Sequence, residues 1–401
     1  MTRGFGTRTL VRALLREYPL CDACLGRQFP RSEPTRSNAE QGHRLRRRAG
    51  LPSRPHVCWL CEDLTARIPQ LADLVTHTLA NHEFATFLVG ASLPSAFSDR
   101  EDALRARFKL RGGEPLKSEL TREVGQRVAA ILKRRVRFRG ADVTVLLDPR
   151  AQAVQVRSRS VFVMGRYVKT RRGLPQRQAK CAACHGRGCE TCRYSGHSSE
   201  PSVEALLQRV LVASFGARDA VFTWVGSEDE DSLVLGHGRP FYLELLDPKV
   251  RHLPRRIPRR IDGIRLTSLR RLRERPTHPR EFTGRFRLLV ETAALVARGK
   301  LREVEAKFRD VRVSAFSPRK RKTLTKRIYS LSAKRRGPQR LELVVTTDGG
   351  LNLKKFVSGA PAAAHEPPEV FPNIATVLGT DATCSRFDVL AIRPRVSIRN
   401  P

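Results

Sequence analysis

The chain has 401 residues, and its 76 Lys and Arg against 39 Asp and Glu give a formal net charge of +37. This excess favours a polyanionic partner, nucleic acid in particular, over a membrane, because no apolar run is long enough to span a bilayer. The length suggests about two or three domains. The N-terminus lacks a secretory signal, so we expect a cytoplasmic protein.

The first predicted elements are a short helix over 8–18 and two cysteine knuckles. Cys21 and Cys24 form one C-x-x-C pair, and Cys58 and Cys61 form a second pair after 33 intervening residues. Each pair can occupy one edge of a tetrahedron of thiolates around zinc, and four thiolates close the site to water. We therefore expect one structural zinc site rather than two unrelated buried pairs.

The next segment alternates helix-like and strand-like patterns. Apolar residues recur at helical spacing in two long stretches and at strand spacing in three shorter ones. The helices are expected at 64–82 and 116–135, and the strands at 84–91, 142–147 and 153–156. This order predicts an α/β accessory domain with arginines on its exposed faces.

A second group of cysteines follows a strand-like run, SVFVMGRYV, and a basic turn. Its spacing is C-x2-C-x4-C-x2-C, and two glycines within it permit the sharp reversal that binding to one metal requires. The four residues are Cys181, Cys184, Cys189 and Cys192. Zinc is the favoured metal, and an iron–sulfur cluster is the alternative, because thiolates alone do not identify the metal.

Ser202 is placed to cap a helix, and we take this point as the start of a second domain. Strand-like runs and basic connectors then alternate, which predicts a mixed sheet with one face toward RNA. The runs lie at 221–225, 240–246, 285–291, 326–332, 341–346 and 386–392. The connector 251–275 contains ten arginines, and we interpret it as a solvated loop able to contact phosphates.

An acidic stretch, Glu228, Asp229, Glu230 and Asp231, stands out in the otherwise basic second half. A carboxylate held among cations stays ionised, and Arg239 follows nearby as one such cation. The stretch is therefore either an acidic hairpin tip or the site of a catalytic carboxylate.

Many segments in family order resemble the archaeal and eukaryotic tRNA pseudouridine synthases that act on positions 54 and 55 of the T-loop. CDACLGR resembles the first cysteine knuckle of that family, and FATFLVGASLP and EPLKSELTREVGQRV resemble its THUMP-containing region. CAACHGRGCETC, LGHGRPFYLEL, GRFRLLVETAALV and GLNLKKFVSG match later segments. The resemblance covers nearly the whole chain and implies tRNA as the partner, with no nucleotide cofactor and no cofactor for the chemistry.

The resemblance also implies roles for individual residues. The family carries its catalytic aspartate in a G-R-E-D-x-D motif, and the matching GSEDED places it at Asp229, with Ser227 in place of the motif arginine. Lys354 matches a basic position of the family active site, so it is either a partner of Asp229 or an exposed helix lysine. The residues expected to contact the substrate are Phe286, at the family's tyrosine position, Leu353, Arg239 and Tyr329.

These inferences combine into an α/β (α+β) protein in four parts. A zinc-knuckle segment occupies 1–63, a THUMP-type RNA-binding domain 64–180, a cysteine-rich connector 181–200, and a catalytic domain 201–401. The catalytic domain is expected to hold a mixed, largely antiparallel sheet flanked by helices. The replacement of family residues at Ser227, Leu233 and Phe286 leaves an alternative function, a catalytically impaired relative that binds tRNA or acts as an RNA chaperone.

Overall fold

The computed structural model describes residues 6–30, 37–52, 57–275, 281–317, 322–360 and 370–395. Contacts divide the chain into two compact units, Met1–Arg159 and Ser160–Pro401. The predicted four-part division stays a prediction, and the contact boundary lies earlier than the predicted start of the catalytic domain. No helix in the described ranges is long and apolar enough to cross a bilayer.

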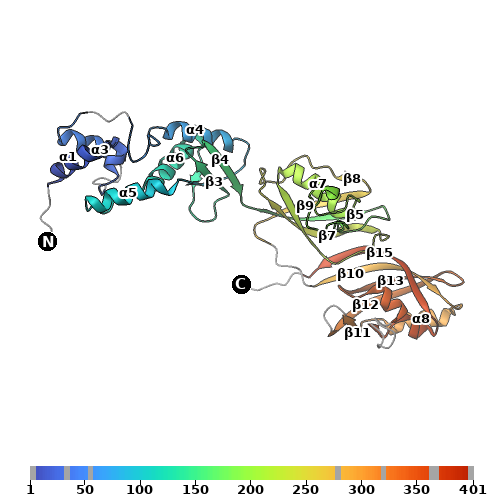
Figure 1. The fold of residues 1–401 in the computed structure, drawn as a ribbon. Coiled ribbons are helices and arrows are strands. Elements are labelled where there is room, and N and C mark those ends of the chain that lie inside the picture. Colours follow the sequence, from blue (N-terminus) through green and yellow to red (C-terminus); the bar gives the residue numbers. More distant parts are fainter. Residues whose placement is uncertain are drawn as a thin grey trace. The chain divides into compact units, whose positions relative to one another are not determined.

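The first unit holds a four-stranded sheet covered by helices (Figure 1). Its strand order is β2-β1-β3-β4, with β1 parallel to β2 and β3 and with β3 antiparallel to β4. The strands are β1 (Thr86–Ala91), β2 (Arg135–Val136), β3 (Val143–Asp148) and β4 (Ala153–Ser158). The helices are α1 (Thr7–Glu17), α2 (Asp22–Gly26), α3 (Asn38–Arg48), α4 (Ile68–Leu79), α5 (Ser95–Arg107) and α6 (Leu116–Leu132).

Helices α2 and α3 cross at two glycines. A Cβ at Gly26 would lie 1.9 Å from the carbonyl oxygen of Asn38, and a Cβ at Gly42 would lie 1.7 Å from that of Asp22. Only glycine permits this approach, and it fixes α3 beside the segment that carries Cys21 and Cys24.

The second unit is built on an eleven-stranded sheet formed by the described strands. The order is β14-β11-β12-β13-β10-β15-β7-β5-β9-β8, and β6 pairs with β7. All pairings are antiparallel except that of β15 with β7, which meet at a single position, Val389 and Val234. The strands are β5 (Val161–Lys169), β6 (Asp219–Trp224), β7 (Val234–Leu246), β8 (Arg260–Ile261), β9 (Ile264–Leu272), β10 (Phe282–Thr292), β11 (Val311–Ser317), β12 (Lys322–Gly337), β13 (Arg340–Asp348), β14 (Val370–Phe371) and β15 (Ala382–Pro394).

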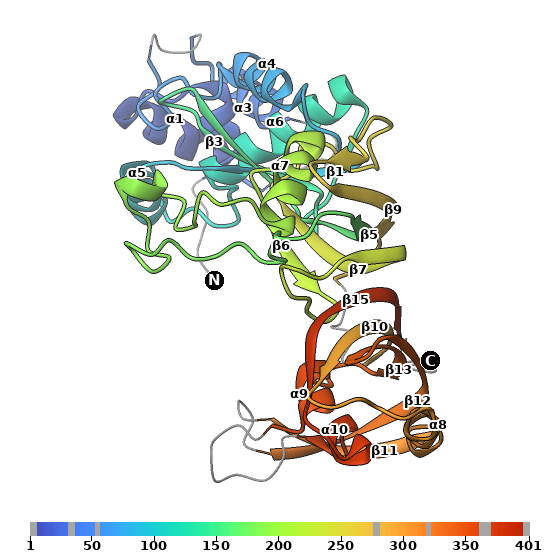
Figure 2. The same cartoon turned by 90° about the vertical axis from the view of Figure 1, so that its right-hand side faces the viewer.

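Helices cover this sheet at two places. The helix α7 packs beside β6, and α8, α9 and α10 group near β12 and β15 (Figure 2). Their bounds are α7 (Val203–Phe215), α8 (Arg298–Lys307), α9 (Leu353–Ser358) and α10 (Ile374–Leu378), and a 3-10 turn, η1, spans Glu190–Cys192. The mixed, largely antiparallel sheet flanked by helices that the sequence predicts is thus confirmed.

Local signals account for the correct elements and for one wrong interpretation. The Ser202 hydroxyl accepts a hydrogen bond from the Ala205 amide at 3.0 Å, as expected of an N-cap. The connector 251–275, in contrast, is not all loop, because strand β9 lies within it. Ile264 and Leu266 are buried there and alternate with exposed arginine and threonine. This strand alternation is hard to recognise in the sequence because arginines are so frequent in the segment.

Candidate active site and cysteine sites

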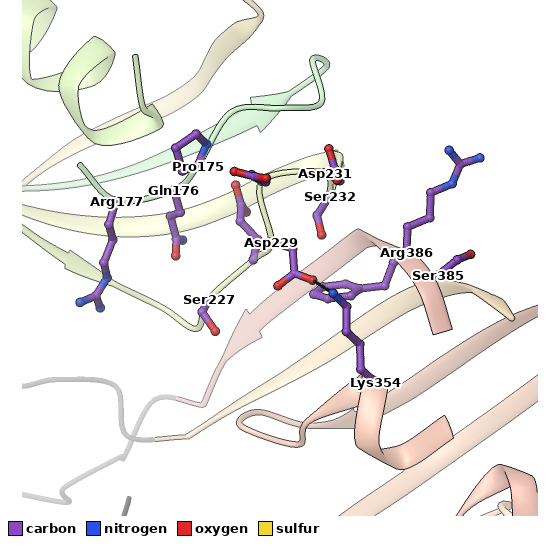
Figure 3. Close-up of a pocket in the computed structure, with 13 residues that line it drawn as sticks. Pro175, Gln176, Arg177, Ser227, Asp229, Asp231, Ser232, Lys354, Ser385 and Arg386 are labelled. Carbon is purple, nitrogen blue, oxygen red and sulfur yellow. Dashed lines mark ion pairs between the residues drawn. The ribbon is translucent and has the colours of Figure 1, made fainter. Parts of the chain in front are cut away.

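The acidic stretch lies in the loop between β6 and β7, which lines a pocket of about 490 Å3. Helix α9 and strand β15 supply the facing wall, through Lys354 and through Ser385, Arg386 and Phe387 (Figure 3). The second residue of the loop is Gly226 at φ +75°, where a Cβ would lie 2.6 Å from the Phe282 ring. Glycine is therefore required for the chain to turn into the pocket.

Asp229 and Lys354 meet inside this pocket. The Lys354 Nζ lies 2.7 Å from the Asp229 Oδ2, and the two side chains are 51% and 44% exposed. Accepting this hydrogen bond, Asp229 raises the pKa of Lys354 above its usual value, so the ammonium stays protonated at neutral pH. The pair thus presents an accessible carboxylate held by a fixed cation, the geometry expected from the sequence.

Beneath the loop lies a buried charged network that the sequence did not reveal. The Lys169 ammonium, 0% exposed, donates hydrogen bonds to the carbonyl oxygens of Leu174 at 2.8 Å, Asp229 at 3.2 Å and Glu230 at 3.0 Å. Its nitrogen also lies 3.5 Å from the Glu228 carboxylate. Burial lowers the pKa of Lys169, and these acceptors are what allow a charge to remain there.

Arg239 belongs to the same network and does not line the pocket. Its guanidinium is fully buried, ion-pairs with Glu228 at 2.8 Å, and donates to the carbonyl oxygens of Val225 and Ser227 at 2.8 and 3.0 Å. Because each of its three nitrogens donates a hydrogen bond below the loop, Arg239 positions the loop. A role in substrate contact, as expected from the sequence, finds no support in this geometry.

A second anchor holds the far end of the loop. The buried Asp388 of β15 pairs with Arg172 and Arg287, both at 2.8 Å, and its carboxylate accepts the Leu233 amide at 3.0 Å. Arg172 also donates to the carbonyl oxygen of Asp231. The hydrogen bonds and charges lower the pKa of Asp388 despite its burial, so the anchor stays ionised.

The aromatic ring that lines the pocket is that of Phe387 rather than Phe286. Phe286 is 7% exposed, and its ring packs edge-on against Phe387 with centroids 6.2 Å apart. It therefore supports the pocket wall from behind. Phe387 is half-buried on β15, beside a register shift between β10 and β15, and simple alternation in the run CSRFDVLAI does not predict its place at the pocket.

Two further predicted residues lie away from the pocket lining. Leu353, 6% exposed, packs in the hydrophobic core and fixes the start of α9, so it places its neighbour Lys354. The Tyr329 hydroxyl donates to the Asp348 carboxylate at 2.8 Å and contacts Arg395. The structure therefore brings together Asp229 and Lys354, with Leu353 adjacent, but not Tyr329.

Each predicted cysteine group is gathered at one point. The sulfur atoms of Cys21, Cys24, Cys58 and Cys61 lie within 4.8 Å of one another, and so do those of Cys181, Cys184, Cys189 and Cys192. The measured separations run from 3.7 to 3.9 Å. A disulfide needs about 2.05 Å, whereas four thiolates about 2.3 Å from one tetrahedral ion lie ~3.8 Å apart. Either group could hold a metal ion.

The backbone at these knuckles is also arranged for thiolates. The amide of Cys21 donates to the Cys58 sulfur at 3.2 Å, and the amides of Gly188 and Gly196 donate to the sulfurs of Cys184 and Cys192 at 3.2 and 3.3 Å. Such bonds stabilise negative sulfur, the form that binds metal. The donor set therefore fits a closed four-thiolate centre at each position.

Comparison with known proteins shows two family models that match. The model described as "Pus10, C-terminal" matches residues 162–393, and "Pus10 THUMP domain, archaeal" matches residues 71–148. A curated relative named "tRNA pseudouridine synthase Pus10" from Cenarchaeum symbiosum is 33% identical, covering 93% of this chain and 89% of the relative. One of the same name from Nitrosopumilus maritimus is 28% identical, covering 94% and 96%.

Likeness to solved structures is weaker. The "Crystal Structure of a Cbf5-Nop10-Gar1 Complex" is 11% identical and covers 57% of this chain and 48% of that chain, with a TM-score of 0.30. This value is too low to bear on the site.

Proposed function

Because this chain belongs to the Pus10 family, we propose that it is a tRNA pseudouridine synthase that isomerises uridine in the T-loop, at position 54, position 55 or both, with Asp229 as the catalytic carboxylate. The observation that carries the assignment is the accessible carboxylate of Asp229, held at 2.7 Å by Lys354 in a pocket. The relatives' shared name supports the substrate class.

The reaction needs no energy donor, because product and substrate are isomers. The bond between uracil N1 and the ribose breaks, the uracil rotates, and a bond forms from C5 to the same ribose carbon. The hydrogen at C5 is lost and N1 gains one. One ionised carboxylate is the minimum requirement, whether it attacks the ribose or the base ring.

Lys354 serves this carboxylate in two ways. Its positive charge lies at ion-pair distance and offsets the negative charge of Asp229, and its place on α9 fixes the carboxylate orientation. A uridine inside a folded tRNA must leave its stack to reach such a pocket. The ring of Phe387, on the pocket wall, is placed to pack against the extruded base, with Phe286 holding it from behind.

The cysteine groups are proposed to hold one zinc ion each. Cys21, Cys24, Cys58 and Cys61 would hold one, and Cys181, Cys184, Cys189 and Cys192 the other. Zinc bound by four thiolates supplies structural stability, because no coordination position stays open for water or substrate. The chemistry is therefore assigned to the side chains of the pocket. A cytoplasmic location fits a tRNA substrate and the nine free cysteines.

The test is to incubate an unmodified tRNA transcript with the protein and map pseudouridine chemically at each T-loop position. The wild type should form pseudouridine at position 54, 55 or both, and Asp229→Asn should form none while still binding tRNA. Glu230→Gln is the matched control, because it removes a neighbouring exposed carboxylate from the same loop. Equal product from Asp229→Asn and Glu230→Gln would refute the role of Asp229.

The same assay separates the alternative function. Tight tRNA binding by the wild type without any pseudouridine would identify a catalytically impaired relative that binds tRNA or acts as a chaperone.

A further inference from the structure

Two arginines on the pocket rim have no part in the chemistry above. Arg177 follows β5, and Arg386 lies in β15, and both line the pocket with exposed side chains. Among the described residues, neither guanidinium takes part in an ion pair or a side-chain hydrogen bond. The usual explanation of such arginines, neutralisation of nearby acids, therefore does not apply to them.

Both arginines are mounted on firmly held backbone. Arg177 lies between Gln176, whose carbonyl oxygen accepts the Glu204 amide at 3.0 Å, and Gln178, whose amide donates to the Glu204 carboxylate at 3.0 Å. Arg386 lies in β15, where it is paired with Leu289 of β10. The backbone that carries each guanidinium is thus fixed relative to the pocket, which reduces the entropy lost when the guanidinium binds a ligand.

The charge of the pocket explains why such cations are needed. Its lining holds four acids, Glu228 to Asp231, and three cations, Arg177, Lys354 and Arg386, and Glu228 is already paired with Arg239 and Lys169 below the loop. Lys354 is already committed to Asp229. A nucleotide carries a phosphate on each side, and carboxylates in the loop repel both. Free cations at the rim are what can offset that repulsion.

The positions of the two side chains match this requirement. Figure 3 shows Arg177 and Arg386 on opposite sides of Asp229. We propose that each guanidinium binds one of the two phosphates that flank the extruded uridine, so that the pair holds the RNA strand across the pocket entrance. A guanidinium can donate two parallel hydrogen bonds to a phosphate, which orients the strand as well as attracting it. This inference rests on the proposed function.

The test combines substitution of an arginine by alanine with replacement of a phosphate by an uncharged methylphosphonate. Target tRNA is assembled by ligation with one methylphosphonate on the 5′ or the 3′ side of the target uridine, and with 2′-O-methyl groups that are also present in the all-phosphate control. Binding is measured by fluorescence anisotropy. We expect each methylphosphonate to weaken wild-type binding about ten-fold, as for loss of one charge-assisted contact.

Arg177→Ala should be insensitive to one of the two methylphosphonates, changing by about two-fold or less, and Arg386→Ala to the other. Each variant should also lower the slope of log affinity against log salt by about 0.7–0.9. Arg209→Ala is the matched control, because Arg209 is exposed on α7 and lies outside the pocket lining. It should stay sensitive to both methylphosphonates.

The outcomes separate the two proposals. If the wild type forms pseudouridine but Arg177→Ala and Arg386→Ala respond to both methylphosphonates like Arg209→Ala, the phosphate contacts are refuted and the enzyme assignment stands. If each arginine variant is insensitive to one methylphosphonate but no pseudouridine forms on any tRNA, the enzymatic function is refuted. The rim arginines then remain phosphate-binding residues of an RNA-binding protein.

Discussion

Replacement of Lys169 by methionine tests whether the buried network orders the acidic loop. Methionine nearly matches the length of lysine but cannot donate, so Lys169→Met removes the bonds to the carbonyl oxygens of Leu174, Asp229 and Glu230 without opening a large cavity. The change also removes the cation 3.5 Å from Glu228. Everything at the pocket surface is left chemically intact.

The expected cost follows from what is left unpaired. Glu228 keeps Arg239 at 2.8 Å, so its charge remains compensated, but three backbone acceptors lose their buried donor. Each buried acceptor that loses its donor costs about 1–3 kcal/mol, so the loss of three such bonds should cost about 3 kcal/mol or more. We expect that loss in the free energy of unfolding of the second unit. Because Asp229 is held through its own backbone, we also expect pseudouridine formation to slow by about 100-fold.

The two tryptophans make the measurement specific. Trp59 lies in the first unit, and Trp224 ends β6 in the second, directly before the loop. In a Trp59→Phe background, Trp224 fluorescence during urea unfolding reports the second unit alone. Activity is measured under single-turnover conditions with saturating enzyme, so that a change in tRNA affinity does not enter the rate.

Lys334→Met is the control, since Lys334 is an exposed lysine of β12 in the same unit. It should change the unfolding free energy by less than about 0.5 kcal/mol. The reasoning fails if Lys169→Met matches Lys334→Met in both unfolding and rate. Loss of stability with an unchanged rate at low temperature would show that the network supports the fold but not the position of Asp229.

The remaining predictions concern the first unit and the cysteine groups. Burial raises the pKa of Glu119 to about 7, so its contribution to stability is present below its unfolded pKa and is lost as pH rises through about 7. Glu119→Gln should remove about 3 kcal/mol of that pH dependence. The free energy of unfolding is measured by Trp59 fluorescence in urea at pH 5 and 8. Gly42→Ala, whose Cβ would meet the carbonyl oxygen of Asp22 at 1.7 Å, should lower the unfolding free energy by about 1–3 kcal/mol in the same assay. Elemental analysis should find about two zinc ions per chain, and Cys24→Ser and Cys184→Ser should each lose one; full zinc content in either variant would contradict its site.

Local patterns predicted the parts of this protein that depend on local physics. The cysteine knuckles, the cap at Ser202, the four helices α1, α4, α6 and α7, and most strands follow from spacing and from side-chain chemistry within a few residues. The family resemblance suggests the pairing of Asp229 with Lys354. It could not be derived from spacing, because a loop and a helix distant in the chain meet only through the sheet.

What escaped prediction depends on tertiary burial. Lys169 reads as one more cation in a basic turn, and nothing in the letters VKTRRG distinguishes it from exposed neighbours. Its importance arises because β5 ends beneath the loop. Arg239 follows the acidic stretch closely in sequence, which suggests a place at the substrate. Sequence proximity does not indicate on which side of the loop a guanidinium lies, and Arg239 is buried below it.

The single paired position between β7 and β15 has a consequence for how this enzyme can lose its activity. Asp229 depends on the β5–β7 side of that junction and Lys354 on the β10–β15 side, so the 2.7 Å contact exists only when both sides are folded and joined. The ion pair between Asp229 and Lys354 therefore forms only in the native state of this unit. A partly folded chain could keep most of its secondary structure and still bind RNA, yet it would not catalyse the reaction.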